Sequence, residues 1–166
     1  NKFQITQDFS EFDPERIASE TVEEATSLFG ASSLKSGSYP VILRRDVAAQ
    51  ILSTFSSTLS AENVQKDLSL FKGKLGEQVA ADNFNLIDDP FLEGGFNSTP
   101  FDGEGVATKK KNVIENGRLT TFLHNLKTAR RAGVETTGNA YRSSHKSSVD
   151  IAPTNMYIKP GERSYY

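Results

Sequence analysis

The chain has no cysteine and no tryptophan, one methionine and two histidines among its 166 residues. The absence of cysteine excludes disulfides and thiolate metal sites. No apolar run approaches the ~20 residues that a membrane-spanning helix needs, and the first residues lack the apolar stretch of a signal peptide. We therefore expect a cytoplasmic protein that has no membrane partner.

Neither sign of charge is in large excess: 21 acidic residues oppose 19 basic ones and leave a formal net charge of −2. Such a balance builds no basic field of the kind that phosphate-dominated binding requires. The longest basic run, Lys109-Lys110-Lys111, falls in a β-prone stretch, where side chains alternate between two faces. We interpret it as a solvated strand face and expect no nucleic-acid partner.

The length predicts one domain with a core of its own. The chain opens on Asn1 with an alternating pattern already under way, and it closes on Tyr165 and Tyr166 just after an expected strand. These ends favour a piece of a longer polypeptide, or an ordered core left after proteolysis.

Three segments carry helix signals. Asp13 and Pro14 provide an N-cap and a first-turn proline, and apolar residues at three-to-four spacing follow until Gly30. Asp46 predicts the cap of a helix from 47 to about 59. A short helix is expected over 126–132, ended by Gly133.

The clearest strand signal is Asn116-Gly117 between two β-prone runs, which predicts a type I′ hairpin over 109–124. Further strands are expected at 39–43, 84–88 and 154–159. The run at 39–43 is apolar and predicts a buried strand. The combination predicts an α+β fold: a mixed, largely antiparallel sheet with packed helices.

Two longer connections are rich in glycine and polar residues. The stretch 93–105 predicts an ordered loop, whereas 136–148 predicts a mobile one. Within the second, Gly138-Asn139 is typical of a turn, and contact of its backbone with a partner is the alternative.

Few residues offer metal or acid–base chemistry. A zinc site built from the two histidines, His124 and His145, would need Asp102 or Glu104 as well. We interpret His124 as a surface or helix-capping residue and His145 as solvent-exposed. Asp102 and Glu104 suit a general acid–base pair if their loop is extended. We favour turn chemistry instead, with Asp102 capping the turn and Gly103 and Gly105 supplying unusual φ angles, in a loop that borders a peptide groove.

No nucleophile elbow surrounds any serine, and the glycines at 94, 95, 103 and 105 are followed by no Lys-Ser or Lys-Thr pair that would make a phosphate loop. The local motifs alone therefore assign no reaction.

Four segments taken together are similar to the TldD/PmbA family, on its PmbA (TldE) side. The four segments are 35–43, 73–79, 100–108 running into 114–117, and 128–133 with 137–140. The resemblance divides the chain into a linker helix region, 1–34, and an incomplete C-terminal domain, 35–166. The family was formerly described as a modulator of DNA gyrase.

What the resemblance implies is a cytosolic assembly of TldD with TldE that processes or degrades unfolded peptides. TldD-type chains carry a zinc motif, His-Glu-x-x-x-His, on the helix after the Pro-Val-Ile-Leu-like strand. The corresponding positions here hold Ser53, Thr54 and Thr58. Hydroxyls neither bind zinc tightly nor replace the carboxylate base, and the helix at 46–59 contains no His, Glu or Cys.

We therefore expect a non-catalytic subunit with no metal or cofactor of its own and with zinc only in a TldD-type partner. Its peptide groove would be bordered by Asp102, Glu104, Gly105, Gly138 and Asn139, and would hold an extended peptide through main-chain pairing. Two alternatives stay open. One is an independent zinc metallopeptidase with ligands outside the chain, and the other is a homodimeric peptide-binding scaffold without enzymatic activity.

Overall fold

The computed structural model describes residues 4–162 and divides into two compact units, 1–42 and 43–166. The first unit contains a 3₁₀ turn, Phe9–Glu11, and helix α1, Pro14–Ser27. The predicted helix start is confirmed, because the Asp13 side chain accepts a hydrogen bond from the Arg16 backbone N–H at 2.9 Å.

The buried strand predicted at 39–43 is wrong. This stretch has no strand assignment, and its side chains are largely exposed, with Val41 at 72% and Ile42 at 76%. An apolar run becomes a strand only where a neighbour supplies pairing partners, and the described part of the chain supplies none here.

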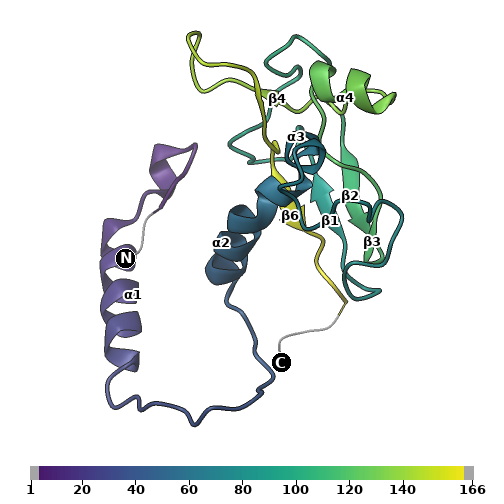
Figure 1. Cartoon of the computed structure of the whole chain (residues 1–166). Helices are drawn as coiled ribbons and strands as arrows, with labels where there is room; N and C mark the ends of the chain where they lie inside the picture. Colours follow the sequence, from purple (N-terminus) through teal and green to yellow (C-terminus); the bar gives the residue numbers. More distant parts are fainter. Residues whose placement is uncertain (1–3, 163–166) are drawn as a thin grey trace. The chain divides into compact units, whose positions relative to one another are not determined.

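The second unit is built on antiparallel strands, which confirms the predicted α+β class (Figure 1). Four strands form one sheet in the order β3-β2-β1-β6, and two more form a small second sheet. The strands are β1, Leu86–Asp88; β2, Lys111–Glu115; β3, Arg118–Leu119; β4, Ala140–Tyr141; β5, Asp150–Ile151; and β6, Met156–Ile158.

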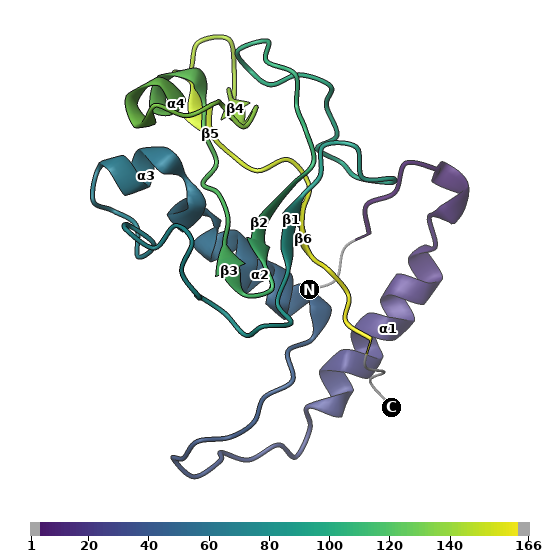
Figure 2. The same cartoon turned by 90° about the vertical axis from the view of Figure 1, so that its right-hand side faces the viewer.

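The helices of this unit are α2, Arg45–Phe55, continued by the 3₁₀ turn Ser56–Leu59; α3, Ala61–Gln65; and α4, Leu126–Ala132. In Figure 2, α2 crosses behind the strands and covers one face of the four-stranded sheet. The predicted cap at Asp46 is wrong. The N-cap is Arg44, and the Asp46 carboxylate lies in the first turn, where it pairs with the Arg44 guanidinium at 2.6 Å.

Helix α4 begins and ends where the sequence predicted. Asn125 and Thr128 form a reciprocal capping box at its start, and Gly133 adopts the left-handed conformation at its end, with φ 69°. The helix packs beside α3. The core residues are Leu59, Ala61, Leu86, Val113, Ile114, Leu119, Phe122 and Leu123.

The predicted hairpin is confirmed. Asn116 and Gly117 have φ angles of 48° and 76°, and they join β2 to β3. The outer edge of β3 is covered by a preceding segment: the Leu119 N–H donates to Glu77 O at 3.0 Å, and the Val79 N–H donates to Gly117 O at 2.8 Å. One edge of the sheet is therefore closed.

The other edge strand of the sheet, within residues 4–162, is β6. Lys159 N–H donates to Asn85 O at 2.9 Å and Asp89 N–H donates to Asn155 O at 3.0 Å, and both pairs belong to the ladder with β1. In an antiparallel ladder the alternate residues point the other way, so the backbone groups of Met156 and Ile158 face outward. No strand within residues 4–162 pairs with them.

The connection at 136–148 is more structured than predicted. It contains β4, and Asn139 is buried with 1% exposure.

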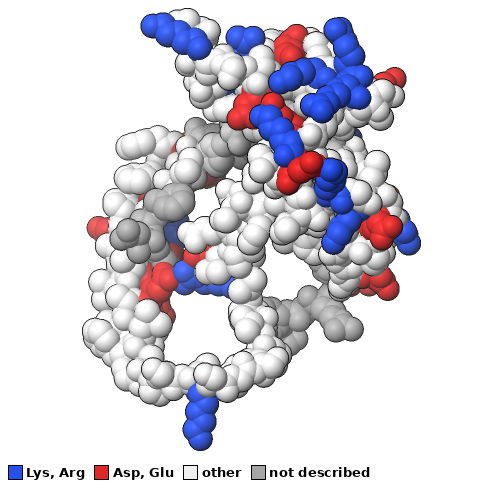
Figure 3. Space-filling view, in the orientation of Figure 1, with Lys and Arg blue, Asp and Glu red and all other residues white. Residues whose placement is uncertain are grey.

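No helix among the described residues is long and apolar enough to cross a membrane. Over α4 and the strands of the second unit, acidic and basic side chains lie among one another (Figure 3).

We expect Gly117→Ala to lower the free energy of unfolding by about 2 kcal/mol or more. A non-glycine residue at this φ is strained by ~1–3 kcal/mol, and its Cβ would overlap with the Gln78 amide and with the Ala80 and Ala81 carbonyls. Urea unfolding would measure the loss. The matched control is Gly94→Ala, which has φ 69° and nothing within 4 Å of the added Cβ. Equal losses in the two variants would contradict the steric argument.

Candidate functional site

A polar cleft of about 520 Å³ lies beside the carboxyl-terminal end of α2. Ser53 and Ser56 form its helical wall, and the facing walls come from the connections 97–102, 138–141 and 152–154. Segments far apart in the sequence thus meet here. Three of the predicted groove residues, Asp102, Gly138 and Asn139, line this cleft together with Ser53.

Asp102 is 7% exposed, and both of its carboxylate oxygens accept hydrogen bonds from backbone N–H groups. Oδ1 accepts from Glu104 at 2.9 Å and from Val106 at 3.0 Å, while Oδ2 accepts from Ala140 at 3.0 Å. The side chain therefore closes its own turn and ties that turn to β4. Gly103 has no positive φ, contrary to expectation; its lack of a Cβ matters because Ala140 O would lie 3.1 Å from that atom.

Glu104 points to a different element. Its Oε2 accepts a hydrogen bond at 2.8 Å from the backbone N–H of Leu126, the first residue of α4. Gly105 has φ 77° and no atom within 4 Å of a built Cβ, so its role is that of a turn residue. The structure thus does not bring Asp102 and Glu104 together as an acid–base pair, and Glu104 and Gly105 are not among the residues lining the cleft.

Gly138 and Asn139 form the wall between α4 and β4. Gly138 has φ 68°, and a Cβ there would lie 2.9 Å from Ala107 O. The Asn139 amide nitrogen donates to Asp88 Oδ2 at 2.8 Å and to Ala152 O at 3.1 Å. The Asn139 amide therefore donates to groups within the protein, and these hydrogen bonds fix the position of the cleft wall.

Behind this wall lies a fully buried carboxylate that the sequence did not single out. Asp88, at the end of β1, has 0% exposure. Its Oδ2 lies 2.9 Å from Lys111 Nζ, and its Oδ1 accepts from both the backbone N–H and the hydroxyl of Thr154 at 2.7 Å. With Asn139 as a further donor, four groups satisfy one carboxylate. The only sequence signals were an acidic residue ending an apolar run and a lysine opening the next strand.

Two positions of the expected zinc motif, Ser53 and Thr54, lie on α2, and the third, Thr58, lies in the 3₁₀ turn that continues it. Ser53 lines the polar cleft, and Thr58 lines a neighbouring apolar groove. Thr54 is exposed, and its hydroxyl donates to Gln50 O at 2.8 Å. The Thr58 hydroxyl likewise donates to a backbone carbonyl, that of Phe55, at 2.6 Å.

The apolar groove has a volume of about 340 Å³ and separates α2 from the sheet. Ile51 and Phe55 border it from the helix, at 43% and 55% exposure, and Ile158 of β6 borders it from the sheet, at 41% exposure. The polar cleft and the apolar groove both border α2. Thr154 lines the cleft and Ile158 lines the groove.

These residues do not fit a catalytic zinc ion. The three motif positions supply neutral hydroxyls where zinc requires imidazole or carboxylate. Among the described residues, no group of three His, Cys, Asp or Glu side chains is placed to hold a metal ion. The Asp102 carboxylate, which lines the cleft, and the buried Asp88 carboxylate behind its wall both already accept hydrogen bonds from several donors.

His124 is buried, with 7% exposure, so the interpretation as a surface or capping residue is wrong. Burial lowers the pKa of its imidazole, an effect only partly opposed by a hydrogen bond with the Thr128 backbone. Within the described chain its Nδ1 has no hydrogen-bond partner. Its backbone contacts the cleft wall, where the His124 carbonyl accepts the Asn139 N–H at 3.3 Å. His145 is exposed, as predicted.

We expect Asp88→Asn to lower the free energy of unfolding by about 3–5 kcal/mol, because it leaves the buried Lys111 ammonium without its counter-charge. Urea unfolding would measure the change, and Asp88→Asn combined with Lys111→Met should recover part of it. Asp67→Asn is the matched control: Asp67 forms an exposed pair with Lys72, and such pairs contribute ~0–1 kcal/mol. A loss at position 88 no larger than at 67 would contradict the assignment.

We also expect His124 to make stability depend on pH. Since burial lowers the pKa of His124 in the folded state, the unfolded state takes up the proton more readily. Stability is therefore full above the ordinary pKa of 6.5 and falls as the pH drops below it. His124→Gln should flatten the stability profile between pH 7 and 5. Equal slopes in the wild-type and His124→Gln proteins would refute this.

Residues 36–166 match the family model described as the PmbA/TldA metallopeptidase C-terminal domain. A metalloprotease of Methanocaldococcus jannaschii is 37% identical over 90% of this chain and 33% of its own length. A solved structure from Thermotoga maritima, described as a candidate modulator of a DNA gyrase, is 46% identical with a TM-score of 0.88, over 96% of this chain and 36% of that one.

The structure of TldE from Thermococcus kodakarensis is 34% identical with a TM-score of 0.63, over 69% of this chain and 27% of that one. The chain thus spans about a third of the length of the curated relatives that it matches, 36% and 33% for two of them. Family model, relatives and solved structures agree with the four sequence segments and with the mixed fold, and the chain belongs to the PmbA/TldD family of metallopeptidase-like proteins, which it matches in the C-terminal domain.

Proposed function

We propose that this chain is the peptide-holding C-terminal domain of a TldE-type, non-catalytic subunit of a cytoplasmic peptidase assembly. A TldD-type partner would supply the zinc and the hydrolysis of unfolded peptides. The observation that carries the proposal is the slot between α2 and the segment 154–158, lined by the hydroxyls of Ser53 and Thr58. The resemblance assigns these two positions to the zinc motif of a TldD-type helix. Likeness to the Thermococcus kodakarensis TldE supports the choice of subunit.

The slot suits an extended peptide. One side of it is the open edge of β6, where Met156 and Ile158 present backbone donors and acceptors outward. An added strand would satisfy these groups and gain affinity from main-chain hydrogen bonds, which are independent of peptide sequence. The slot is also lined at one end by small hydroxyl side chains, Ser53 and Ser56, which leave room for a backbone.

Metal analysis tests whether this protein itself binds zinc and cleaves peptides or needs a partner to do so. The full-length protein purified alone should contain no stoichiometric zinc and should cleave no unfolded peptide. Purified from its source cell, it should be accompanied by a protein that carries His-Glu-x-x-x-His. Stoichiometric zinc together with chelator-sensitive cleavage in the absence of a partner would instead establish an independent metallopeptidase. Recovery of self-associated protein only, with peptide binding, would establish a homodimeric scaffold.

We expect Ile158→Pro to weaken binding of a fluorescent unfolded peptide by about 2- to 10-fold, because proline removes one outward N–H and a hydrogen bond contributes ~0.5–1.5 kcal/mol. The ladder to β1 should survive, since residues 157 and 159 make its bonds and proline is tolerated where the N–H faces outward. Fluorescence anisotropy with the full-length protein would measure the change.

The matched control for that prediction is Ile158→Val, which keeps the N–H and an apolar side chain in the groove and should bind as the wild type does. Unchanged binding by the proline variant, with its fold intact by circular dichroism, would exclude the β6 edge as the peptide site.

A further inference from the structure

The turn between β2 and β3 contains a pair of residues that is prone to covalent change. In an Asn-Gly pair the backbone nitrogen of the glycine can attack the side-chain carbonyl carbon of the asparagine, since glycine has no Cβ to hinder the approach. Asn116 is exposed at the tip of this turn, whereas Gly117 is buried. The pair that gives the hairpin its positive φ angles is therefore also a candidate site of deamidation.

Deamidation of this pair would proceed through a cyclic intermediate. A bond forms between the Gly117 nitrogen and Cγ of Asn116, the bond from Cγ to the side-chain nitrogen breaks, and ammonia leaves with the proton of the Gly117 N–H. Solvent water then adds to either carbonyl of the resulting succinimide ring. Opening of the ring leaves aspartate or isoaspartate at position 116, and the chain gains one negative charge.

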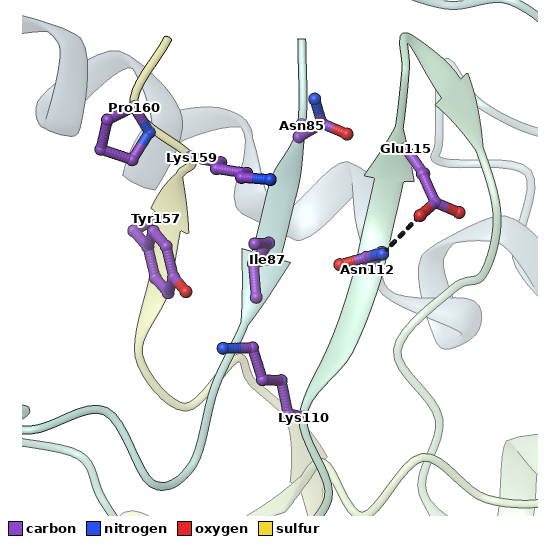
Figure 4. Close-up of a pocket in the computed structure, with 8 residues that line it drawn as sticks. All are labelled: Asn85, Ile87, Lys110, Asn112, Glu115, Tyr157, Lys159 and Pro160. Atoms are coloured by element: carbon purple, nitrogen blue, oxygen red, sulfur yellow. Dashed lines mark hydrogen bonds between the residues drawn. The ribbon is translucent and has the colours of Figure 1, made fainter. Parts of the chain in front are cut away.

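The folded turn blocks the first of these steps, because its N–H groups are already bonded. The Asn116 N–H donates to Asn85 Oδ1 at 2.9 Å, and the Gly117 N–H donates to Phe84 O at 2.8 Å. In Figure 4, Asn85 lies where the chain enters β1, beside the end of β2 that carries Glu115 and leads into the turn. The nitrogen that would attack is therefore held toward β1 as a donor.

The carbonyl groups of the turn are also bonded. Asn116 O accepts a hydrogen bond from the Gln78 side-chain amide at 3.0 Å. Gly117 O accepts from the backbone N–H groups of Val79 and Ala80, at 2.8 and 3.0 Å. The backbone N–H and C=O of both residues thus have partners within this unit, and rotation of the Asn116 side chain and backbone into the attacking geometry would break these bonds.

We propose that Asn116 is a deamidation site that reacts only when the β2–β3 turn separates from the segment 78–85. Proteins open locally, in units that require less free energy than global unfolding. An opened turn frees the Gly117 nitrogen and lets the Asn116 side chain approach it. Each hydrogen bond that must break first should slow the reaction by about 2- to 10-fold.

The reaction would also prevent the turn from closing as before. Isoaspartate carries the main chain through its side chain, which adds one backbone atom between β2 and β3 and disturbs the pairing of Ile114 with Leu119. Leu119 is fully buried, so this disturbance reaches the core. Aspartate leaves the backbone unchanged but adds a negative charge next to Glu115. Deamidation therefore turns a reversible opening of this edge into a permanent change.

Incubation of the full-length protein at mildly alkaline pH, with and without urea, would test the proposal. Mass spectrometry of the peptide that contains position 116 measures the rate, and chromatography separates the two products. We expect the folded protein to react about 100-fold more slowly than the unfolded one, or more slowly still, because several hydrogen bonds must break first. Equal rates in the two states would overturn the proposal.

Variants of the holding segment test whether local opening controls the rate. Asn85→Ala removes the acceptor of the Asn116 N–H, and Gln78→Ala removes the donor to its carbonyl. Each should raise the folded-state rate by about 2- to 10-fold and leave the rate in urea unchanged. The matched control is Asn63→Ala, which removes a hydrogen bond to Ser57 O at 2.8 Å and should change neither rate. Equal acceleration by the control would show that the reaction follows global unfolding and would overturn the local opening.

Discussion

The Asp88 carboxylate is the constraint on which the arrangement of this unit depends. It is fully buried at the end of β1, and it accepts hydrogen bonds from Lys111 of β2, from Asn139 before β4 and from Thr154 before β6. Burying a charge is costly unless it is paired and its remaining lone pairs are satisfied. The favourable arrangement is therefore the one in which all three segments meet at this group, and that meeting also sets the positions of the cleft walls.

A second buried carboxylate likewise holds separate segments together by accepting several hydrogen bonds. Asp102 accepts three backbone hydrogen bonds, one of them from Ala140 in β4. Its carboxylate thus accepts a strand N–H that the carbonyl of a neighbouring strand would otherwise accept. Buried side chains that bond to the backbone can organise loops that regular ladders do not reach. The cleft is thus walled by connections, yet those connections are held by buried polar groups, as expected for a binding surface on a rigid frame.

Local signals predicted local structure well. The Asn116-Gly117 hairpin, the helix start at Asp13-Pro14 and the helix end at Gly133 each depend on the φ angles or caps of a few adjacent residues, and each is confirmed. The predicted strand at 39–43 is wrong because pairing is non-local: an apolar run does not show whether a partner strand exists.

The site was predictable only in part. Asp102, Gly138 and Asn139 were chosen for their turn chemistry, and they line one cleft. The Asp88 cluster was missed because its four members are spread from residue 88 to residue 154, a separation that no periodicity reveals. The burial of His124 was also missed, although the groups that contact its backbone, Thr137 and Asn139, follow in the same stretch of chain.

The slot beside α2 is independent of the residues that would make it catalytic. Its shape comes from the buried carboxylates, from β6 and from the apolar face of the helix, and none of these requires a metal ion. Hydroxyls at the metal-ligand positions remove the chemistry but leave the surface facing the slot small and uncharged. An extended backbone can approach such a surface without desolvating a charge. Hydroxyls at these positions and a slot that can hold a peptide are therefore physically compatible, as the proposed function requires.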